Sequence, residues 1–103
     1  MSDHRFVRMA ELEIDPDHID TYKALLDEEI AASIERELDV LMLHAVSLRD
    51  APHHIRILEV YASRAAYEAH IQTPHFLAYK AATTNMVASL RLLDADPIHL
   101  GAR

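Results

Sequence analysis

Residues suited to binding and deprotonating an aromatic compound are concentrated in one stretch of the sequence, residues 55–80. This stretch holds three of the four tyrosines, two of the eight histidines and one of the two phenylalanines. An imidazole titrates near neutral pH, and tyrosine supplies a flat ring with a hydroxyl that can hold a ligand oxygen. We expect one small cavity lined by these side chains and one acidic residue: Glu59, Tyr61, Tyr67, His70, His75, Phe76 and Tyr79.

His70 is the first candidate for a general base or for a group that orients the substrate. It lies three residues after Tyr67 on a predicted helix, so both side chains share one face of that helix. The alternative is a histidine that is hydrogen-bonded within the core and serves packing alone.

A predicted hairpin brings a second histidine toward this region. Residues 40–48 and 55–62 are rich in aliphatic side chains and are predicted strands, and residues 49–54 contain the turn formers aspartate and proline. If all six of these residues form the loop, Leu48 lies opposite Ile55, and this sets the register of the whole hairpin.

In that register His44 lies opposite Glu59, on the same face of the sheet as Tyr61. A carboxylate beside an imidazole can orient the ring and keep it basic, as in many active sites. His44 and Glu59 are therefore further catalytic candidates. The alternative is an ion pair that only fixes the strand register, with Lys80 or Arg91 as the partner of Glu59.

The remaining aromatic side chains are candidates for binding the substrate. Tyr61, Tyr67 and Tyr79 offer flat walls and hydroxyls, although ordinary packing of helices on a sheet is the competing role. For Phe76 the core is the stronger alternative. His75 follows a proline at a predicted helix start, where it can act as a neutral donor or acceptor or serve the helix start alone.

Length and charge limit the class of protein. A chain of 103 residues buries roughly 65% of its unfolded surface, so residues 1–103 are predicted to form a single domain. The formal charge of -7 and the lack of a Lys/Arg cluster argue against nucleic acid and anionic membrane as partners. The sequence shows neither a membrane span nor a signal peptide, and we expect a cytoplasmic protein.

The composition also limits metal and cofactor binding. Cysteine is absent, which excludes thiolate sites, and the single glycine, Gly101, excludes a glycine-rich phosphate loop. His53 and His54 lie in a predicted turn, and His70 and His75 are five residues apart across a helix break, which is not a standard ligand spacing. We predict no dedicated metal site.

The predicted elements run strand, helix, strand, strand, helix pair, strand. The predicted strands are residues 6–14, 40–48, 55–62 and 89–96. The predicted helices begin after the capping residues Asp15, Ser63 and Thr73, and Pro16 and Pro74 occupy the first helical positions after two of them. The second helix spans residues 64–72 and the third residues 74–87. The charged run Glu35-Arg36-Glu37 ends the first helix and is expected to be solvated surface.

This order predicts an α+β, ferredoxin-like domain with a four-stranded antiparallel sheet. Helices cover one face of that sheet. The second face is also apolar, and the same face of a second copy is the most economical cover for it.

The motif Glu59-x-Tyr61, with Tyr67, His70 and Thr73-Pro74-His75-Phe76, resembles the antibiotic biosynthesis monooxygenase (ABM) domain, in particular small quinol monooxygenases. The similarity covers nearly the whole chain. It implies a ferredoxin-like protomer that pairs through its sheet face into a homodimer, a dimeric α/β barrel, with one cavity per protomer. The sequence departs from the pattern of this family in two ways. It contains no tryptophan, and it has Leu38-Asp39 at the position where relatives usually have Pro-Gly.

The function implied by this resemblance is oxidation of a small phenol or hydroquinone to a quinone with O2 and no cofactor. His70 or His44 would serve as base and Glu59 as the orienting carboxylate. Two alternatives use the same cavity: an isomerase or tautomerase of a small molecule, and a non-catalytic dimeric module that binds a small ligand.

Overall fold

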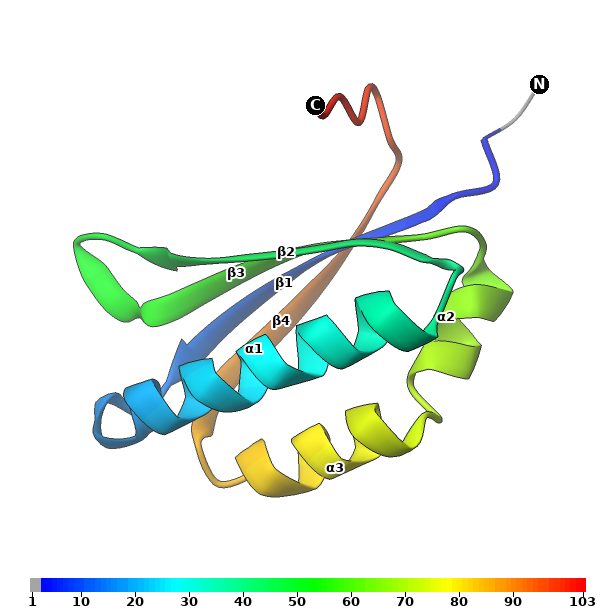
Figure 1. Cartoon of the computed structure of the whole chain (residues 1–103). Helices are drawn as coiled ribbons and strands as arrows, with labels where there is room; N and C mark the ends of the chain where they lie inside the picture. The colour runs from blue at the N-terminus through cyan, green and yellow to red at the C-terminus, as the bar shows by residue number, and fades with distance from the viewer. Residues whose placement is uncertain (1–2) are drawn as a thin grey trace.

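The computed structural model describes residues 3–103 (Figure 1). In chain order the elements are β1 (Phe6–Ile14), the 3-10 helix η1 (Pro16–His18), α1 (Ile19–Arg36), β2 (Val40–Leu48), β3 (Ala51–Tyr61), α2 (Arg64–His70), α3 (Pro74–Thr83) and β4 (Val87–Ala95). Within residues 3–103, no helix is both long and apolar enough to cross a membrane.

The strands form one antiparallel sheet in the order β2-β3-β1-β4. The central strands are therefore β3 and β1, and β2 and β4 are the edges. Figure 1 shows the α-helices together on one side of this sheet, so within residues 3–103 the other side carries no helix. The predicted α+β ferredoxin-like fold with a four-stranded antiparallel sheet is confirmed.

Side-chain caps begin the helical segments where the sequence predicted them. Asp15, Ser63 and Thr73 each accept a hydrogen bond from a backbone N–H in the first turn that follows. Pro16 and Pro74 occupy the first helical positions, where the missing N–H costs nothing. The cap at Thr73, with Pro74 after it, begins α3 as a helix separate from α2.

The last helix ends earlier than predicted. It stops at Thr83 rather than near Val87, and β4 begins at Val87 rather than at Ser89. The N–H of Met86 donates to the carbonyl of Thr83 at 2.8 Å, and the carbonyl of Met86 accepts from the N–H of Asp15 at 2.8 Å. This second bond ties the turn to the end of β1, a contact that helical periodicity could not reveal.

The hairpin between β2 and β3 has a shorter turn than predicted. Residues 49–50 alone form the turn, and β3 begins at Ala51. The pairing is irregular next to it, because Leu48 pairs with Ala51 whereas Ser47 pairs with Ile55. The extra residues of β3 form a bulge, and beyond it the register is one residue away from the predicted one.

The predicted pairing of His44 with Glu59 is therefore wrong. Leu43 lies opposite Glu59, and His44 lies opposite Leu58. Because neighbouring residues in a strand face opposite sides of the sheet, this slip directs His44 away from the side of Glu59, and the histidine is exposed.

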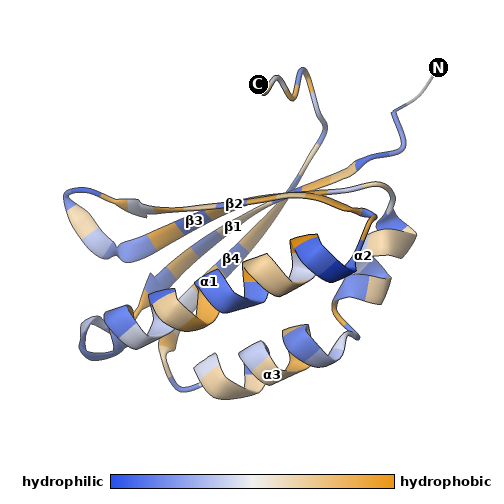
Figure 2. Cartoon of the chain, viewed as in Figure 1, coloured by the Kyte–Doolittle hydropathy of each residue, from blue (hydrophilic) through white to orange (hydrophobic). Residues whose placement is uncertain are grey.

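The core lies between the sheet and the helices. Tyr22 and Leu26 of α1 pack with Leu12, Ile14 and Ile55 of the central strands in the larger cluster. Figure 2 shows hydrophobic and hydrophilic residues alternating along α1, as expected for a helix with one buried side. A smaller cluster lies nearer α2 and contains Val40, Leu43, Tyr61 and Ala66.

Two tyrosine hydroxyls join α1 to α3. The hydroxyl oxygens of Tyr22 and Tyr79 are 2.6 Å apart, and Tyr22 is fully buried. Burial raises the pKa of both phenols above the ordinary value, so both stay protonated and one donates to the other. The pair satisfies two polar groups inside an otherwise apolar contact between helices.

Replacing one hydroxyl of this pair leaves the other without its partner. We expect Tyr22→Phe and Tyr79→Phe each to lower the free energy of unfolding by about 1–3 kcal/mol. The double variant should lose less stability than the sum of the losses in the two single variants, since it buries no unpaired hydroxyl. Urea unfolding of the four proteins measures this coupling, and strictly additive losses would contradict it.

Candidate active site

A cavity of about 420 Å³, here called the central cavity, lies between the helix-covered face of the sheet and the helices. Its size is within the roughly 300–1,000 Å³ of small-molecule sites. Most of its wall is apolar: Ala10, Leu12, Leu26, Ile30, Leu43, Ile57, Ile71, Phe76, Leu77, Leu90 and Leu92. Polar or amphipathic side chains interrupt that wall: Arg8, Glu29, Glu59, Tyr61, Tyr67, His70, Tyr79 and Lys80.

Six of the eight predicted site residues line the central cavity: Glu59, Tyr61, Tyr67, His70, Phe76 and Tyr79. The strand register keeps His44 on the other face of the sheet, as described above. His75 is not part of the cavity wall, although its ring centre lies only 6.3 Å from that of His70.

Glu59 is hydrogen-bonded to a cavity tyrosine. The hydroxyl of Tyr61 donates to Oε1 of Glu59 at 2.6 Å, two residues along the same strand. Burial raises the pKa of Glu59, although the Tyr61 hydrogen bond and the charges of His70 and Arg8 act in the opposite direction. Burial and the adjacent Glu59 raise the pKa of Tyr61 far above its ordinary value, so this hydroxyl remains a donor.

His70 is held by a carboxylate that was expected to be in solvent. Its Nδ1 lies 3.0 Å from Oε2 of Glu37, and Nε2 of His75 lies 2.7 Å from the same oxygen. A carboxylate oxygen accepts and does not donate, so both imidazoles donate an N–H to Glu37. The expectation for Glu37 was wrong: its side chain is only 15% exposed, because α2 and α3 meet beside the end of α1.

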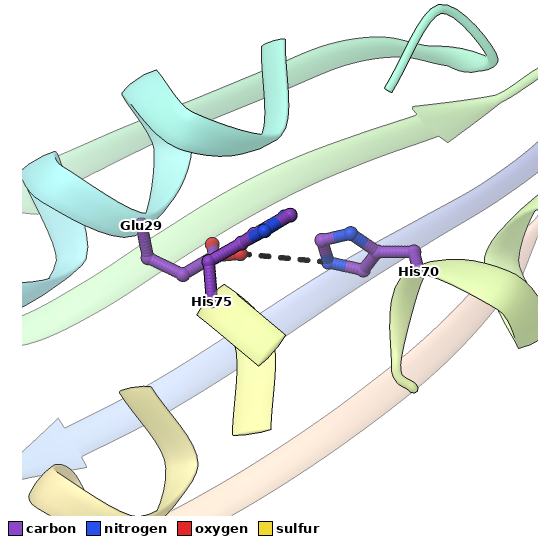
Figure 3. Close-up of side chains that lie close together, drawn as sticks. All are labelled: Glu29, His70 and His75. Carbon is purple, nitrogen blue, oxygen red and sulfur yellow. Dashed lines mark ion pairs between the residues drawn. The ribbon is translucent and has the colours of Figure 1, made fainter. Parts of the chain in front are cut away.

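Glu29 faces the other nitrogen of His70. Its Oε1 lies 3.9 Å from Nε2 of His70 (Figure 3) and accepts a 2.6 Å hydrogen bond from the hydroxyl of Ser33. The side chains of Glu29 and His70 are 6% and 3% exposed, and both line the central cavity. With its proton on Nδ1, His70 presents the lone pair of Nε2 as a proton acceptor on the cavity side.

Arg8 and Tyr67 form a second polar pair in the wall. Nη1 of Arg8 donates to the hydroxyl oxygen of Tyr67 at 2.7 Å, and Nη2 lies 2.8 Å from Oδ1 of Asp94. The guanidinium carbon also lies 4.5 Å from the centre of the Tyr67 ring, a cation–π contact. Because the oxygen of Tyr67 already accepts from Arg8, its hydroxyl hydrogen is free to donate to a ligand.

Arg8, Glu29 and Glu37 were not among the predicted site residues, yet Arg8 and Glu29 line the central cavity and Glu37 holds His70. Glu29 had a signal, since it lies three residues after Leu26 on the buried stripe of α1, where a charged residue is unusual. Arg8 lies directly opposite Glu59 in the pairing of β1 with β3. No local pattern indicates that pairing, because it joins segments about 50 residues apart.

The raised pKa of Glu59 makes a prediction about stability. The folded protein binds this proton more tightly than the unfolded chain, whose ordinary pKa is 4.5. The stabilising contribution is thus complete below pH 4.5 and is lost as pH rises through the folded-state pKa. We expect the stability of the native protein relative to Glu59→Gln to fall from pH 4 toward neutral pH, since the amide never ionises but can still accept from Tyr61. Urea unfolding over this range tests it, and a constant difference would contradict it.

Comparisons with known proteins agree with this fold. The family model described as antibiotic biosynthesis monooxygenase matches residues 5–82. The comparison with curated proteins gave no match. A solved structure of a proposed antibiotic biosynthesis monooxygenase from Bacteroides thetaiotaomicron is 45% identical, covers 97% of this chain and 95% of its own, and superposes with a TM-score of 0.93.

Two further solved structures are more distant. A proposed monooxygenase from Lactobacillus acidophilus is 25% identical with a TM-score of 0.86, and the match covers 88% of this chain but 43% of that one. A proposed antibiotic biosynthesis monooxygenase from Nitrosomonas europaea is 19% identical with a TM-score of 0.89, covers 96% and 95% of the two chains, and shares the fold. Together, the family model over residues 5–82 and the near-complete match at 45% identity show that this chain belongs to the antibiotic biosynthesis monooxygenase family.

Proposed function

We propose that this protein oxidises a small phenol or hydroquinone with O2 in the central cavity, without a bound cofactor. The observation that carries the proposal is the environment of His70. Its Nδ1 is hydrogen-bonded to Glu37, and its Nε2 faces Glu29, which lines the central cavity together with His70. A histidine so held by a carboxylate is oriented to remove a proton from a bound ligand.

Removal of the phenolic proton starts the reaction. Nε2 of His70 accepts it, and the negative charge of Glu37 stabilises the resulting imidazolium through Nδ1. The phenolate gives an electron to O2 far more readily than the phenol does. Most side chains of the cavity wall are apolar, which disfavours water beside the reactive intermediates.

The overall reaction needs no external reductant. One oxygen atom of O2 bonds to a ring carbon of the substrate, which loses two hydrogens and becomes a quinone. These two hydrogens leave with the second oxygen atom as water. All four electrons that O2 requires therefore come from the phenol.

Two hydroxyl groups help to orient the substrate. Tyr67, whose oxygen accepts from Arg8, donates to a substrate oxygen. Tyr61 already donates to Glu59, so this pair offers the substrate mainly an acceptor, the second oxygen of the Glu59 carboxyl group. Phe76 supplies a flat apolar surface for the substrate ring. Its ring centre lies 5.0 Å from that of His70, so a substrate packed on Phe76 would lie near the proposed base.

Oxygen uptake with a panel of hydroquinones and phenols tests this function. We expect His70→Ala to lower the rate by about 100-fold or more, as is usual for loss of a general base. Glu37→Gln should lower it by roughly 10-fold, because it removes a group that acts through His70. His44→Ala is the comparison, and its exposed position predicts the native rate.

Equal rates for the native protein and His70→Ala would exclude His70 as the base. A large loss of oxygen-uptake rate in His44→Ala would instead indicate His44 as the base, the other candidate from the sequence. Turnover that continues under argon would instead indicate an isomerase or tautomerase, since that reaction consumes no oxygen.

We also propose that the helix-free face of the sheet forms a homodimer. Alternation along the strands directs Met9, Leu58 and Leu93 to this face, and the pairing aligns them in one row across β3, β1 and β4. Val46 of the edge strand is 58% exposed. An apolar face of this kind is most simply covered by the same face of a second copy.

A charge in that row should separate the subunits. Leu58→Lys is expected to convert a dimer into a monomer in analytical ultracentrifugation at micromolar concentration, because two like charges would meet near the two-fold axis. Leu77→Lys, on the helical side and already 50% exposed, is the matched control and should remain dimeric. A native protein that sediments as a monomer would refute the proposal.

A further inference from the structure

We infer that Glu29, His70 and His75 form a binding site for one divalent first-row transition-metal ion. The three side chains come from α1, the end of α2 and the start of α3. One potential ligand atom of each lies within 4.8 Å of those of the other two, and Figure 3 shows the side chains directed toward one another. Two imidazoles and one carboxylate are a usual donor set for iron, cobalt, nickel or zinc.

Glu37 prepares both imidazoles to bind such an ion. It accepts an N–H from Nδ1 of His70 and another from Nε2 of His75. Each ring is thereby left with a lone pair on its other nitrogen, which is Nε2 in His70 and Nδ1 in His75. A carboxylate that accepts from the far nitrogen of a histidine is the usual second-layer support of a metal ligand.

Glu29 has a similar support. The Ser33 hydroxyl shares its one hydrogen between Oε1 of Glu29 at 2.6 Å and the backbone carbonyl oxygen of Glu29 at 2.9 Å, one turn earlier on α1. The carboxyl group is thus directed toward His70 rather than toward solvent. Its side chain is 6% exposed, and those of His70 and His75 are 3% and 10% exposed.

The spacing suits a metal after a small adjustment. Two ligand atoms bound to one ion at about 2.1 Å in tetrahedral geometry lie roughly 3.4 Å apart. Oε1 of Glu29 and Nε2 of His70 are 3.9 Å apart, and the ligand atoms of all three residues lie within 4.8 Å of one another, so each pair must approach by between about 0.5 and 1.4 Å at most. They are too far apart to form a hydrogen bond with each other, and Oε1 of Glu29 keeps a second lone pair besides the one that accepts from Ser33.

Charge also favours a cation at this position. With both imidazoles neutral, Glu29 and Glu37 bring two negative charges into a site with little exposure to water. Buried charges of one sign are costly unless an opposite charge accompanies them. A divalent ion between the side chains would balance the two carboxylates.

The ion would also be accessible from the central cavity. Glu29 and His70 line that cavity and His75 does not, so an ion held by all three would lie beside the cavity wall. An open coordination position is the feature that distinguishes catalytic from structural metal sites. Metal binding uses the same Nε2 that accepts a proton in the proposed oxidation, so bound metal should compete with that reaction.

The test measures binding directly and needs no substrate. Protein without a histidine tag is treated with a chelator and titrated with Co²⁺, followed by visible absorption, and with Zn²⁺, followed by calorimetry. We expect one ion per chain. His75→Ala and Glu29→Gln should each weaken binding by at least about 100-fold, the upper range seen even for residues that only support a ligand.

The control replaces two other neighbouring histidines. His53 and His54 have ring centres 4.5 Å apart on β3 and form an alternative surface site for adventitious metal, so the variant carrying alanine at both should bind with native affinity. Circular dichroism verifies that each variant is folded, and Glu29→Gln provides the test if His75→Ala does not fold.

Three results would overturn the inference. These are the absence of saturable binding, unchanged affinity in folded Glu29→Gln, and loss of binding in the variant lacking His53 and His54. Because none involves oxygen uptake, failure of the metal site and failure of the proposed oxidation are distinguishable.

Discussion

The carboxylate of Glu37 is the group on which the arrangement of the site depends. One of its oxygens accepts from His70 and from His75, and so joins the end of α1 to α2 and α3. An acidic residue at the C-terminus of a helix is normally unfavourable, since the helix dipole places negative charge there. The two imidazole N–H groups compensate for this, and in return the carboxylate determines which nitrogen of each ring carries the proton.

A second constraint is that every polar group of the central cavity needs a partner in an apolar wall. Within residues 3–103, the structure leaves no fully buried side-chain nitrogen or oxygen without a hydrogen bond. Tyr61 pairs with Glu59, Arg8 pairs with Tyr67, and Glu29 accepts from the hydroxyl of Ser33, so these three charged groups are each held by a hydroxyl. Such pairs lower the cost of burying charge and also fix the directions in which the remaining donors and acceptors face a ligand.

The fold positions these groups through the register of its central strands. Glu59 and Arg8 lie opposite each other because β1 and β3 pair in an unbroken antiparallel ladder. The adjoining hairpin is less regular, and its bulge shifts β2 by one residue from the expected register. One residue is enough to move His44 to the other side of the sheet, since side chains alternate between the two faces. The histidine beside the cavity is therefore His70, which a helix rather than a strand supplies.

The sequence by itself determined the element order, the helix starts at Asp15, Ser63 and Thr73, the α+β ferredoxin-like fold and six of the cavity residues. These features depend on local hydrogen bonds and on periodic patterns within single segments, which neighbouring residues are sufficient to define. Only the tertiary structure decided which carboxylate holds His70. Glu37 lies 33 residues before it in a run that is indistinguishable from solvated surface, and its burial arises solely because three helix ends meet.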